Sequence, residues 1–174
     1  VKHIPVLHIP DRLNFKVFPD PRPVPERVKV ACWFGYIHNA HAVLDDVMPT
    51  LAKNGINLLI VSNGVFEPTF DYGIKVQNID YKSETAYYDI QKADMVLNPK
   101  INLASFKYKS ENKTVIGWKL GLPVATDGKT FTRLLDYSAR VKEVAARLKF
   151  VEKEYNIVRS GVEYKQLICD IQQK

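Results

Sequence analysis

The feature of this sequence that most constrains its fold is a series of short apolar segments separated by helix-like segments. The apolar segments, such as VKVACWF and INLLIV, are rich in β-branched and aromatic residues, and strands are expected at 28–34, 56–61, 74–79, 95–97 and 124–125. Strands that are apolar throughout are buried on both faces, which is typical of a parallel sheet with helices on each side. The sequence therefore predicts an α/β fold with a doubly wound, Rossmann-like sheet of about five strands.

The intervening segments carry apolar residues at helical spacing, which predicts helices at 40–54, 84–93, about 110–120, 131–136 and 138–153, followed by a final helix. Three of them have sequence signals for their starts. Asn39 and Ser83 are expected to cap the first two helices, and Ser160-x-x-Glu163 is a capping box for the last one. Pro49 is expected to kink or interrupt the first helix.

The N-terminal region differs from the rest in its proline content. Residues 1–27 hold six of the ten prolines, which excludes a helix or a central strand over most of this stretch. We therefore predict two parts: residues 1–26 as a Pro-rich linker or N-terminal appendage, and residues 27–174 as the Rossmann-like domain.

The expected strand order locates the candidate site. If the order is 3-2-1-4-5, ligands bind outside the carboxyl ends of the strands, between the first and fourth strands. A loop follows each of these two strands, and a helix starts after the second loop. Together these segments contain a glycine, polar side chains and several lysines. The candidate ligand-binding residues are Gly35, Tyr36, His38, Asn39, Asn98, Lys100, Lys107, Lys109, Ser110, Asn112 and Lys113.

The chemistry of these loops favours an anionic ligand such as a phosphate. Backbone N–H groups at a helix start attract anions, and nearby lysines add positive charge. Two simpler interpretations stay open: a solvated basic loop before an ordinary helix, and His38 as an exposed loop histidine. The sequence lacks G-x-G-x-x-G, P-loop, G-x-S-x-G and H-E-x-x-H motifs, so we expect no dinucleotide cofactor and no bound metal, and we assign no catalytic residue.

Charge and cysteine content limit the partners and the compartment. The net charge is +6, which is compatible with a phosphate-bearing ligand or an anionic membrane surface, while the scatter of the basic residues argues against nucleic acid. Cys32 and Cys169 are expected as two buried thiols in a reducing compartment, the cytoplasm. We expect neither a bilayer-spanning segment nor a signal peptide, because apolar runs are short and Pro5 and Pro10 interrupt the first residues.

Beyond these local patterns, an ordered set of motifs resembles a known family. YKSETAYYDIQKADMVLNP, the lysine loop and GWKLGLPVATDG resemble the C-terminal half of GT-B glycosyltransferases, most closely the retaining family-four type. HIPDRLNF is similar to the segment that opens that domain, and VACWFGYIHN is similar to its first strand and phosphate-side loop. The resemblance implies one half of a GT-B fold, a donor domain that binds a nucleotide-diphosphate sugar for hexosyl transfer.

The resemblance also assigns roles. It implies that Gly35, Tyr36, His38 and Asn39 line one side of the donor site, and that Lys109, Ser110, Asn112 and Lys113 hold the diphosphate from the other. Gln77 and Asn98 through Lys100 would then lie near the base.

The sequence departs from the family in two respects. The Glu-x7-Glu motif of the family would put acids near Tyr108 and Ile116, and neither is acidic. The family's N-terminal acceptor domain has no counterpart here, so this chain alone is not expected to turn over.

Two other hypotheses follow from the same residues. The first is a non-catalytic interaction module that keeps the glycosyltransferase-like fold and self-associates as a homodimer through an apolar surface. The second is a flavodoxin-like or receiver-like signalling domain, which the five-strand pattern allows. Such a domain needs an acidic cluster after the first strand, and GYIHN has none.

Overall fold

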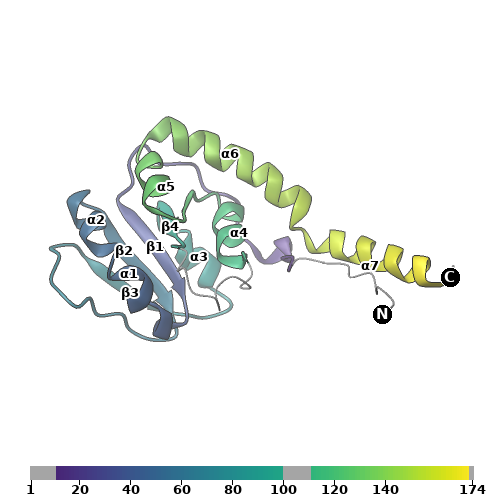
Figure 1. Cartoon of the computed structure of the whole chain (residues 1–174), viewed down its shortest axis with the longest axis horizontal. Coiled ribbons are helices and arrows are strands. Elements are labelled where there is room, and N and C mark those ends of the chain that lie inside the picture. Colours follow the sequence, from purple (N-terminus) through teal and green to yellow (C-terminus); the bar gives the residue numbers. More distant parts are fainter. Residues whose placement is uncertain (1–10, 100–110, 173–174) are drawn as a thin grey trace, which may run out of the picture.

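The computed structural model describes residues 11–99 and 111–172 of the chain. Its core is one parallel sheet with the strand order β3-β2-β1-β4-β5 (Figure 1). The strands are β1 (Val30–Gly35), β2 (Asn57–Ser62), β3 (Val76–Asp80), β4 (Met95–Leu97) and β5 (Val124–Ala125). The predicted α/β class, the parallel sheet and the strand order are confirmed.

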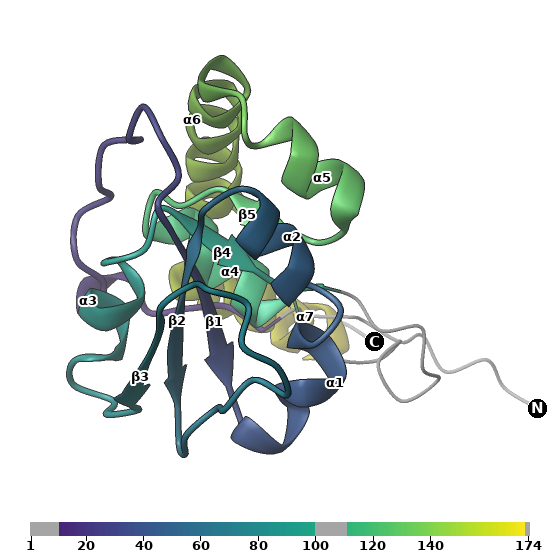
Figure 2. The same ribbon diagram turned by 90° about the vertical axis from the view of Figure 1, so that its left-hand side faces the viewer.

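Helices cover both faces of the sheet. Neighbouring residues of β1 point to opposite faces, so they pack against different helices. Trp33 packs with α1 (His41–Leu44), α2 (Met48–Lys53) and α5 (Gly128–Arg133) on one face. Cys32 packs with α3 (Ala86–Ile90) and α4 (Asn112–Lys119) on the other face. Figure 2 shows this division, with α1 and α2 on one side of the sheet and α3 on the other.

The first predicted helix, 40–54, is not continuous. The chain forms a 3-10 turn, η2 (Ile37–Asn39), and then α1 and α2, which residues 45–47 separate. Pro49 lies in the first turn of α2, where its missing N–H is tolerated, so the break comes just before the proline. The prediction that Asn39 caps this helix is wrong, because Asn39 lies inside η2 and α1 starts after Ala40 without a side-chain cap.

Two further helix starts differ from the predictions. Ser83 does not cap α3; its hydroxyl bonds the Glu84 carboxylate at 2.8 Å, and the residue before α3 is Thr85. The helix predicted at 131–136 begins earlier, as α5, because Asp127 Oδ1 accepts the Thr130 N–H at 2.7 Å and caps it.

The long helix α6 (Tyr137–Glu154) matches its prediction closely. Asp136 Oδ1 accepts the Ala139 N–H at 2.8 Å and caps its start. Trp118 of α4 meets Phe150 of α6 edge to face, with ring centroids 6.2 Å apart. This contact holds α6 across the outside of α4.

The capping-box prediction for the last helix is wrong. Helix α7 (Ile157–Gln172) begins before Ser160, so Ser160 and Glu163 lie inside it. Both side chains bind Arg12: Nη1 donates to Ser160 Oγ at 3.1 Å and to Glu163 Oε2 at 2.7 Å, and Nη2 donates to Glu163 Oε1 at 2.8 Å. Arg12, which is far away in the sequence, thus binds the two side chains that a local capping box would need. Helix α7 extends from the rest of the molecule (Figure 1).

The described part of the proline-rich segment, which includes η1 (Phe15–Val17), is tied to the domain by arginines. Arg22 Nη1 donates to two carbonyl oxygens after α3, at 3.0 and 2.6 Å. Arg140 of α6 is fully buried. Its Nη atoms donate at 2.8–2.9 Å to the carbonyls of Leu134, Leu135, Pro25 and Glu26. The domain boundary near residue 26 stays a prediction.

The two cysteines have different surroundings. Cys32 is fully buried in β1, as predicted, and burial raises the pKa of its thiol. Cys169 in α7 is only half-buried, because none of the residues of this helix is buried, so its prediction as a buried thiol is wrong. Among the described residues, no helix has the length and apolar character required to span a bilayer.

The Arg12–Glu163 contact predicts a pH-dependent anchoring of α7. The hydrogen bond from Arg12 holds the pKa of Glu163 below its usual value of 4.5, so this contribution is present above that pH and lost as the pH falls through the lowered pKa. At pH 7, Arg12→Gln should weaken the hydrogen-exchange protection of the α7 amides, corrected for intrinsic rates, and the difference from wild type should become smaller as the pH falls through the lowered pKa of Glu163. Arg27→Gln changes an exposed arginine of the same segment and should have no effect on α7. Equal protection of wild type and Arg12→Gln at pH 7 would contradict the role of Arg12.

Candidate functional site

The candidate site lies where the strand order reverses, at the carboxyl ends of β1 and β4. Gly35 is the last residue of β1 and pairs in register with Ser62, the last residue of β2. Asn98 directly follows β4. Helix α4 begins after the loop that leaves β4, so its first turn lies at the same edge of the sheet. In doubly wound sheets, ligands bind at this point, where the strand order reverses.

Lys113, in the first turn of α4, lies against Gly35. A Cβ atom added to Gly35 would be 2.5 Å from Lys113 Nζ and 2.9 Å from its Cε. Gly35 also has a φ of +144°, a conformation that other residues adopt only with strain. The backbone conformation therefore requires glycine here, and any side chain at this position would displace the ammonium group beside it.

Aromatic rings hold this ammonium group at the end of β1. Lys113 Nζ lies 4.4 Å from the centroid of the Trp33 ring, within the range of a cation–π interaction, and 6.0 Å from the Phe34 ring. Trp33 is only 1% exposed, so its ring forms a fixed surface beneath the lysine. The two predicted residues Gly35 and Lys113 are thus brought together from positions far apart in the sequence.

Asn98 joins the end of β4 to the same turn of α4. Its Nδ2 donates to Thr114 Oγ1 at 2.9 Å, and Thr114 is buried. The sequence analysis did not single out Thr114. Its place directly after Lys113, on the side of the helix facing the sheet, could have indicated it.

The loop after β1 contains the remaining described candidates of this side. Tyr36 is 72% exposed, His38 is exposed and Asn39 is half-buried. The Asn39 N–H donates to the Tyr36 carbonyl at 3.0 Å, which closes the η2 turn. The loop therefore presents an aromatic ring and an imidazole to solvent at the edge where Lys113 lies.

Asn63, in the turn after β2, contacts this loop and was missed in the sequence analysis. Its Oδ1 accepts the Ile37 N–H at 3.0 Å. The residues Ser62-Asn63-Gly64 are typical of a turn but do not by themselves indicate this contact. That the turn lies next to the loop after β1 follows from the pairing of β1 with β2.

The predicted residues Lys100, Lys107, Lys109 and Ser110 lie outside the described residues. Asn112 is the first residue of α4 and is half-buried. The assignment of all eleven candidates to ligand binding stays a prediction, while the proximity of Gly35, Lys113, Asn98 and the Tyr36–Asn39 loop is a feature of the fold.

A third loop, after β5, reaches the same edge of the sheet. Its Asp127 caps α5, and the N–H of Thr130 is the main group that lowers the pKa of this carboxylate. The Asp127 carboxylate is therefore already bonded to the start of α5. Within residues 11–99 and 111–172, no group of three or more His, Cys, Asp or Glu side chains is arranged to hold a metal ion.

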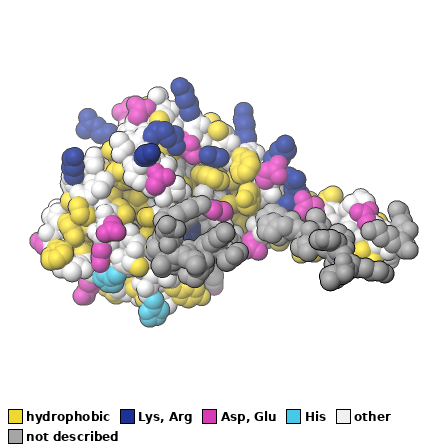
Figure 3. All heavy atoms as spheres, viewed as in Figure 1, with side chains coloured by type: hydrophobic (Ala, Val, Ile, Leu, Met, Phe, Trp, Pro, Cys, Tyr) yellow, Lys and Arg dark blue, Asp and Glu magenta, His cyan; other side chains and the backbone are white. Residues whose placement is uncertain are grey.

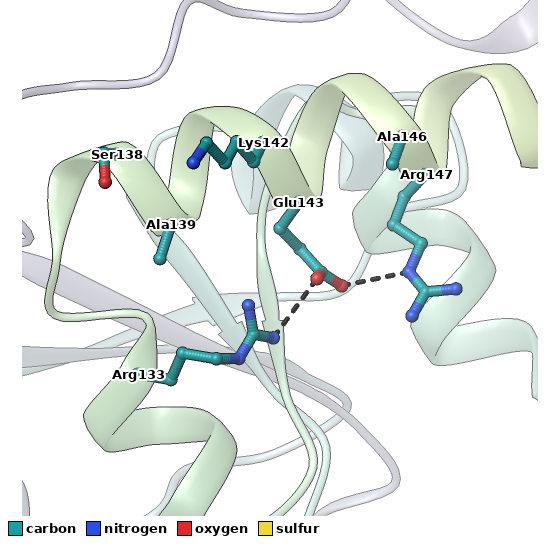
Figure 4. Close-up of a pocket in the computed structure, with 7 residues that line it drawn as sticks. All are labelled: Arg133, Ser138, Ala139, Lys142, Glu143, Ala146 and Arg147. Atoms are coloured by element: carbon teal, nitrogen blue, oxygen red, sulfur yellow. Dashed lines mark hydrogen bonds and ion pairs between the residues drawn. The ribbon is translucent and has the colours of Figure 1, made fainter.

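A separate cavity of about 540 Å³ lies between α5 and α6 (Figure 4). Glu143 lies between two guanidinium groups there: it accepts from Arg133 at 3.1 Å and from Arg147 at 3.0 Å. Lys142 points toward the same space, and lysines and arginines gather along the side of the molecule formed by α6 (Figure 3). No residue of this cavity was predicted for the site. Glu143 pairs with two of the three cations that line this cavity, and the switch point stays the candidate site because ligands of doubly wound sheets bind there.

Comparisons with known proteins identify the fold. No protein-family model matches the chain, and no curated protein matches it. Two crystal structures of HepE from Anabaena do match. The one in complex with UDP and glucose has a TM-score of 0.63 and 11% identity, over 91% of this chain and 55% of HepE. The one in complex with UDP-glucose has a TM-score of 0.60 and 9% identity, over 91% and 56%. The match shows a shared Rossmann-like fold, and the chain spans just over half the length of HepE.

The geometry at Gly35 predicts that one added methyl group lowers the stability of the fold substantially. Gly35→Ala should lower the free energy of unfolding by about 1–3 kcal/mol, because alanine is strained at this φ. Urea denaturation measures the change. Gly128→Ala is the matched control: an added Cβ there meets no atom within 4 Å, and the residue starts α5, so its stability should be unchanged or slightly higher. Equal effects of the two substitutions would contradict the geometric argument.

Proposed function

We propose that this chain is the donor-binding domain of a GT-B glycosyltransferase, which binds a nucleotide-diphosphate sugar for glycosyl transfer. The observation that carries the proposal is the position of Lys113, whose ammonium group lies against Gly35 at the switch point of the sheet. The fold shared with HepE, which has been crystallised with UDP and glucose and with UDP-glucose, supports this choice of ligand.

A diphosphate matches the chemistry of this edge. The first N–H groups of α4 have no partner within their own helix, and the helix dipole adds partial positive charge at the same point. Lys113 adds a full positive charge, and Gly35 has no side chain to keep a phosphate away from the end of β1. In the proposal, Lys107, Lys109, Ser110 and Asn112 complete the phosphate-binding set, and Lys100 belongs with Asn98 to the groups near the base.

The loop after β1 forms the opposite wall of the proposed site. Tyr36, His38 and Asn39 are the groups that would reach the sugar or its phosphate, and Asn98 would lie toward the base. The exposure of Tyr36 and His38 fits a wall that meets a ligand.

The chain by itself is proposed to bind the donor without transferring the sugar. Ile116, at one of the two positions where the family has an acid, packs instead against the apolar core on the side of the sheet that contains Cys32 and Val96. The acceptor site would come from an N-terminal acceptor domain or a partner chain, in line with the coverage of just over half of HepE. We assign no catalytic residue and no metal.

Calorimetry with UDP and with UDP-, GDP- and ADP-sugars tests the proposal. Lys113→Met should weaken binding of the preferred ligand by roughly tenfold to 150-fold, because a hydrogen bond to a charged group contributes about 1.5–3 kcal/mol. Uridine, which lacks phosphates, should bind more weakly than UDP and should be insensitive to Lys113→Met.

The matched control is Lys75→Met. Lys75 is an exposed lysine just before β3, at the amino edge of the sheet, so the variant makes the same change in charge away from the site. It should bind like wild type. If the folded wild type binds no nucleotide or nucleotide sugar at millimolar concentration, the proposal fails.

A second candidate is a non-catalytic interaction module, which the surface of α7 favours. Val158, Val162, Ile168 and Ile171 of this helix are each more than half exposed. Exposed apolar side chains on one helix are typical of a docking surface. If this function holds, sedimentation should detect a dimer that Ile168→Asp dissociates, and no nucleotide sugar should bind. A monomer that binds UDP would exclude it.

A further inference from the structure

We infer that Asn63 is a positioning residue of the donor site: its carboxamide holds the Tyr36–Asn39 loop in the orientation that receives the ligand. The inference rests on the proposed function, because it assigns a role to a residue that acts through the Tyr36–Asn39 loop, called the donor loop below. Asn63 lies on the turn after β2, and the argument concerns its contacts with the neighbouring loop after β1.

The first observation is a hydrogen bond that the loop does not supply itself. The 3-10 turn η2 begins after Tyr36, whose side chain makes no capping hydrogen bond. Instead, Asn63 Oδ1 accepts the N–H of Ile37, the first residue of the turn, at 3.0 Å. Asn63 therefore caps η2 from the turn after β2. Asparagine often has this capping role at the start of its own helix.

The second observation is that the turn carrying Asn63 is itself fixed. Ser62 is fully buried, and its Oγ donates to the Gly64 carbonyl at 2.6 Å and accepts the Gly64 N–H at 3.3 Å. Ser62 also pairs in register with Gly35, so the turn starts beside the residue from which the donor loop leaves. These bonds give Asn63 a fixed base from which to hold its neighbour.

The third observation is a close contact between the turn and the loop. A Cβ atom added to Gly64 would lie 3.0 Å from Cγ2 of Ile37 and 3.3 Å from its Cβ. Gly64 does not have a positive φ, so its backbone conformation does not require glycine. The lack of a side chain at Gly64 makes room for Ile37, and the hydrogen bond and the packing fix the same residue.

The consequence is a donor loop that is ordered before a ligand arrives. Holding Ile37 fixes the direction of the chain on either side, where the exposed Tyr36 and His38 lie. A loop that is already ordered spends less free energy on binding than one that the ligand must order. Asn63 should thus raise affinity without touching the ligand.

Two measurements on Asn63→Ala test the inference. In the absence of ligand, hydrogen exchange of residues 36–39 should become roughly twofold to tenfold faster, and UDP binding measured by calorimetry should weaken by a similar factor. Asn63→Asp keeps an oxygen acceptor for the Ile37 N–H and should restore slow exchange. Gly64→Ala pushes on Ile37 without removing the hydrogen bond, and it should also weaken UDP binding.

Asn57→Ala is the matched control. Asn57 begins β2 and makes the same kind of bond at the opposite edge of the sheet, accepting the Lys75 N–H at 3.0 Å, so its variant should leave UDP binding and the exchange of residues 36–39 unchanged. If Asn63→Ala binds UDP like wild type, the positioning role is overturned while the proposed function stands. If the wild type binds no nucleotide or nucleotide sugar, the proposed function fails and the effect on affinity fails with it. Unchanged exchange in Asn63→Ala would overturn the loop-ordering role in either case.

Discussion

The arrangement of the sheet depends on one carboxylate, that of Asp94. Its Oδ2 accepts the N–H groups of Lys29 and Val30, at 2.8 and 3.0 Å, just where β1 begins. Its Oδ1 accepts from Arg22 at 3.3 Å, and the side chain is mostly buried. Asp94 directly precedes β4, so this group connects the starts of the two strands between which the strand order reverses. The pairing of Ala31 with Met95 follows from it.

That connection matters because β4 is short. It has only three residues, and Val96 faces one apolar core while Met95 and Leu97 face the other. A shift of one residue would exchange these faces and bury the wrong side chains. The same register determines which residues end the strands, and so which loops share the carboxyl edge. The relation between Gly35, Asn98 and the first turn of α4 is thus a consequence of how β1 and β4 start.

The donor site proposed at this edge is built from two kinds of contact. Lys113 is held by a ring beneath it and by the open backbone at Gly35, and these are contacts between α4 and β1. The opposite wall is held by Asn63, a contact between neighbouring strand ends. In a binding site assembled in this way, the positive charge is on a helix and the exposed polar groups are on a loop that a neighbouring turn holds in place.

Local sequence patterns predicted the elements well where the signal is a property of neighbouring residues. The five strands, their order and the long helix at 137–154 agree with the predictions. The helix starts at Asn39, Ser83 and Ser160 were wrong for a common reason. A side chain that can cap locally can also take another partner, and Arg12 reaches Ser160 and Glu163 from the other end of the chain.

The sequence by itself determined the class of fold and the edge of the sheet at which the candidate residues lie. Apolar periodicity and the alternation of strands and helices are local properties, and parallel topology then brings the strand ends together. Only the tertiary structure decided that Lys113 meets Gly35 and that Asn63 caps Ile37. Such contacts join residues distant in sequence, and their distances of a few ångströms depend on register and packing, which no local pattern encodes.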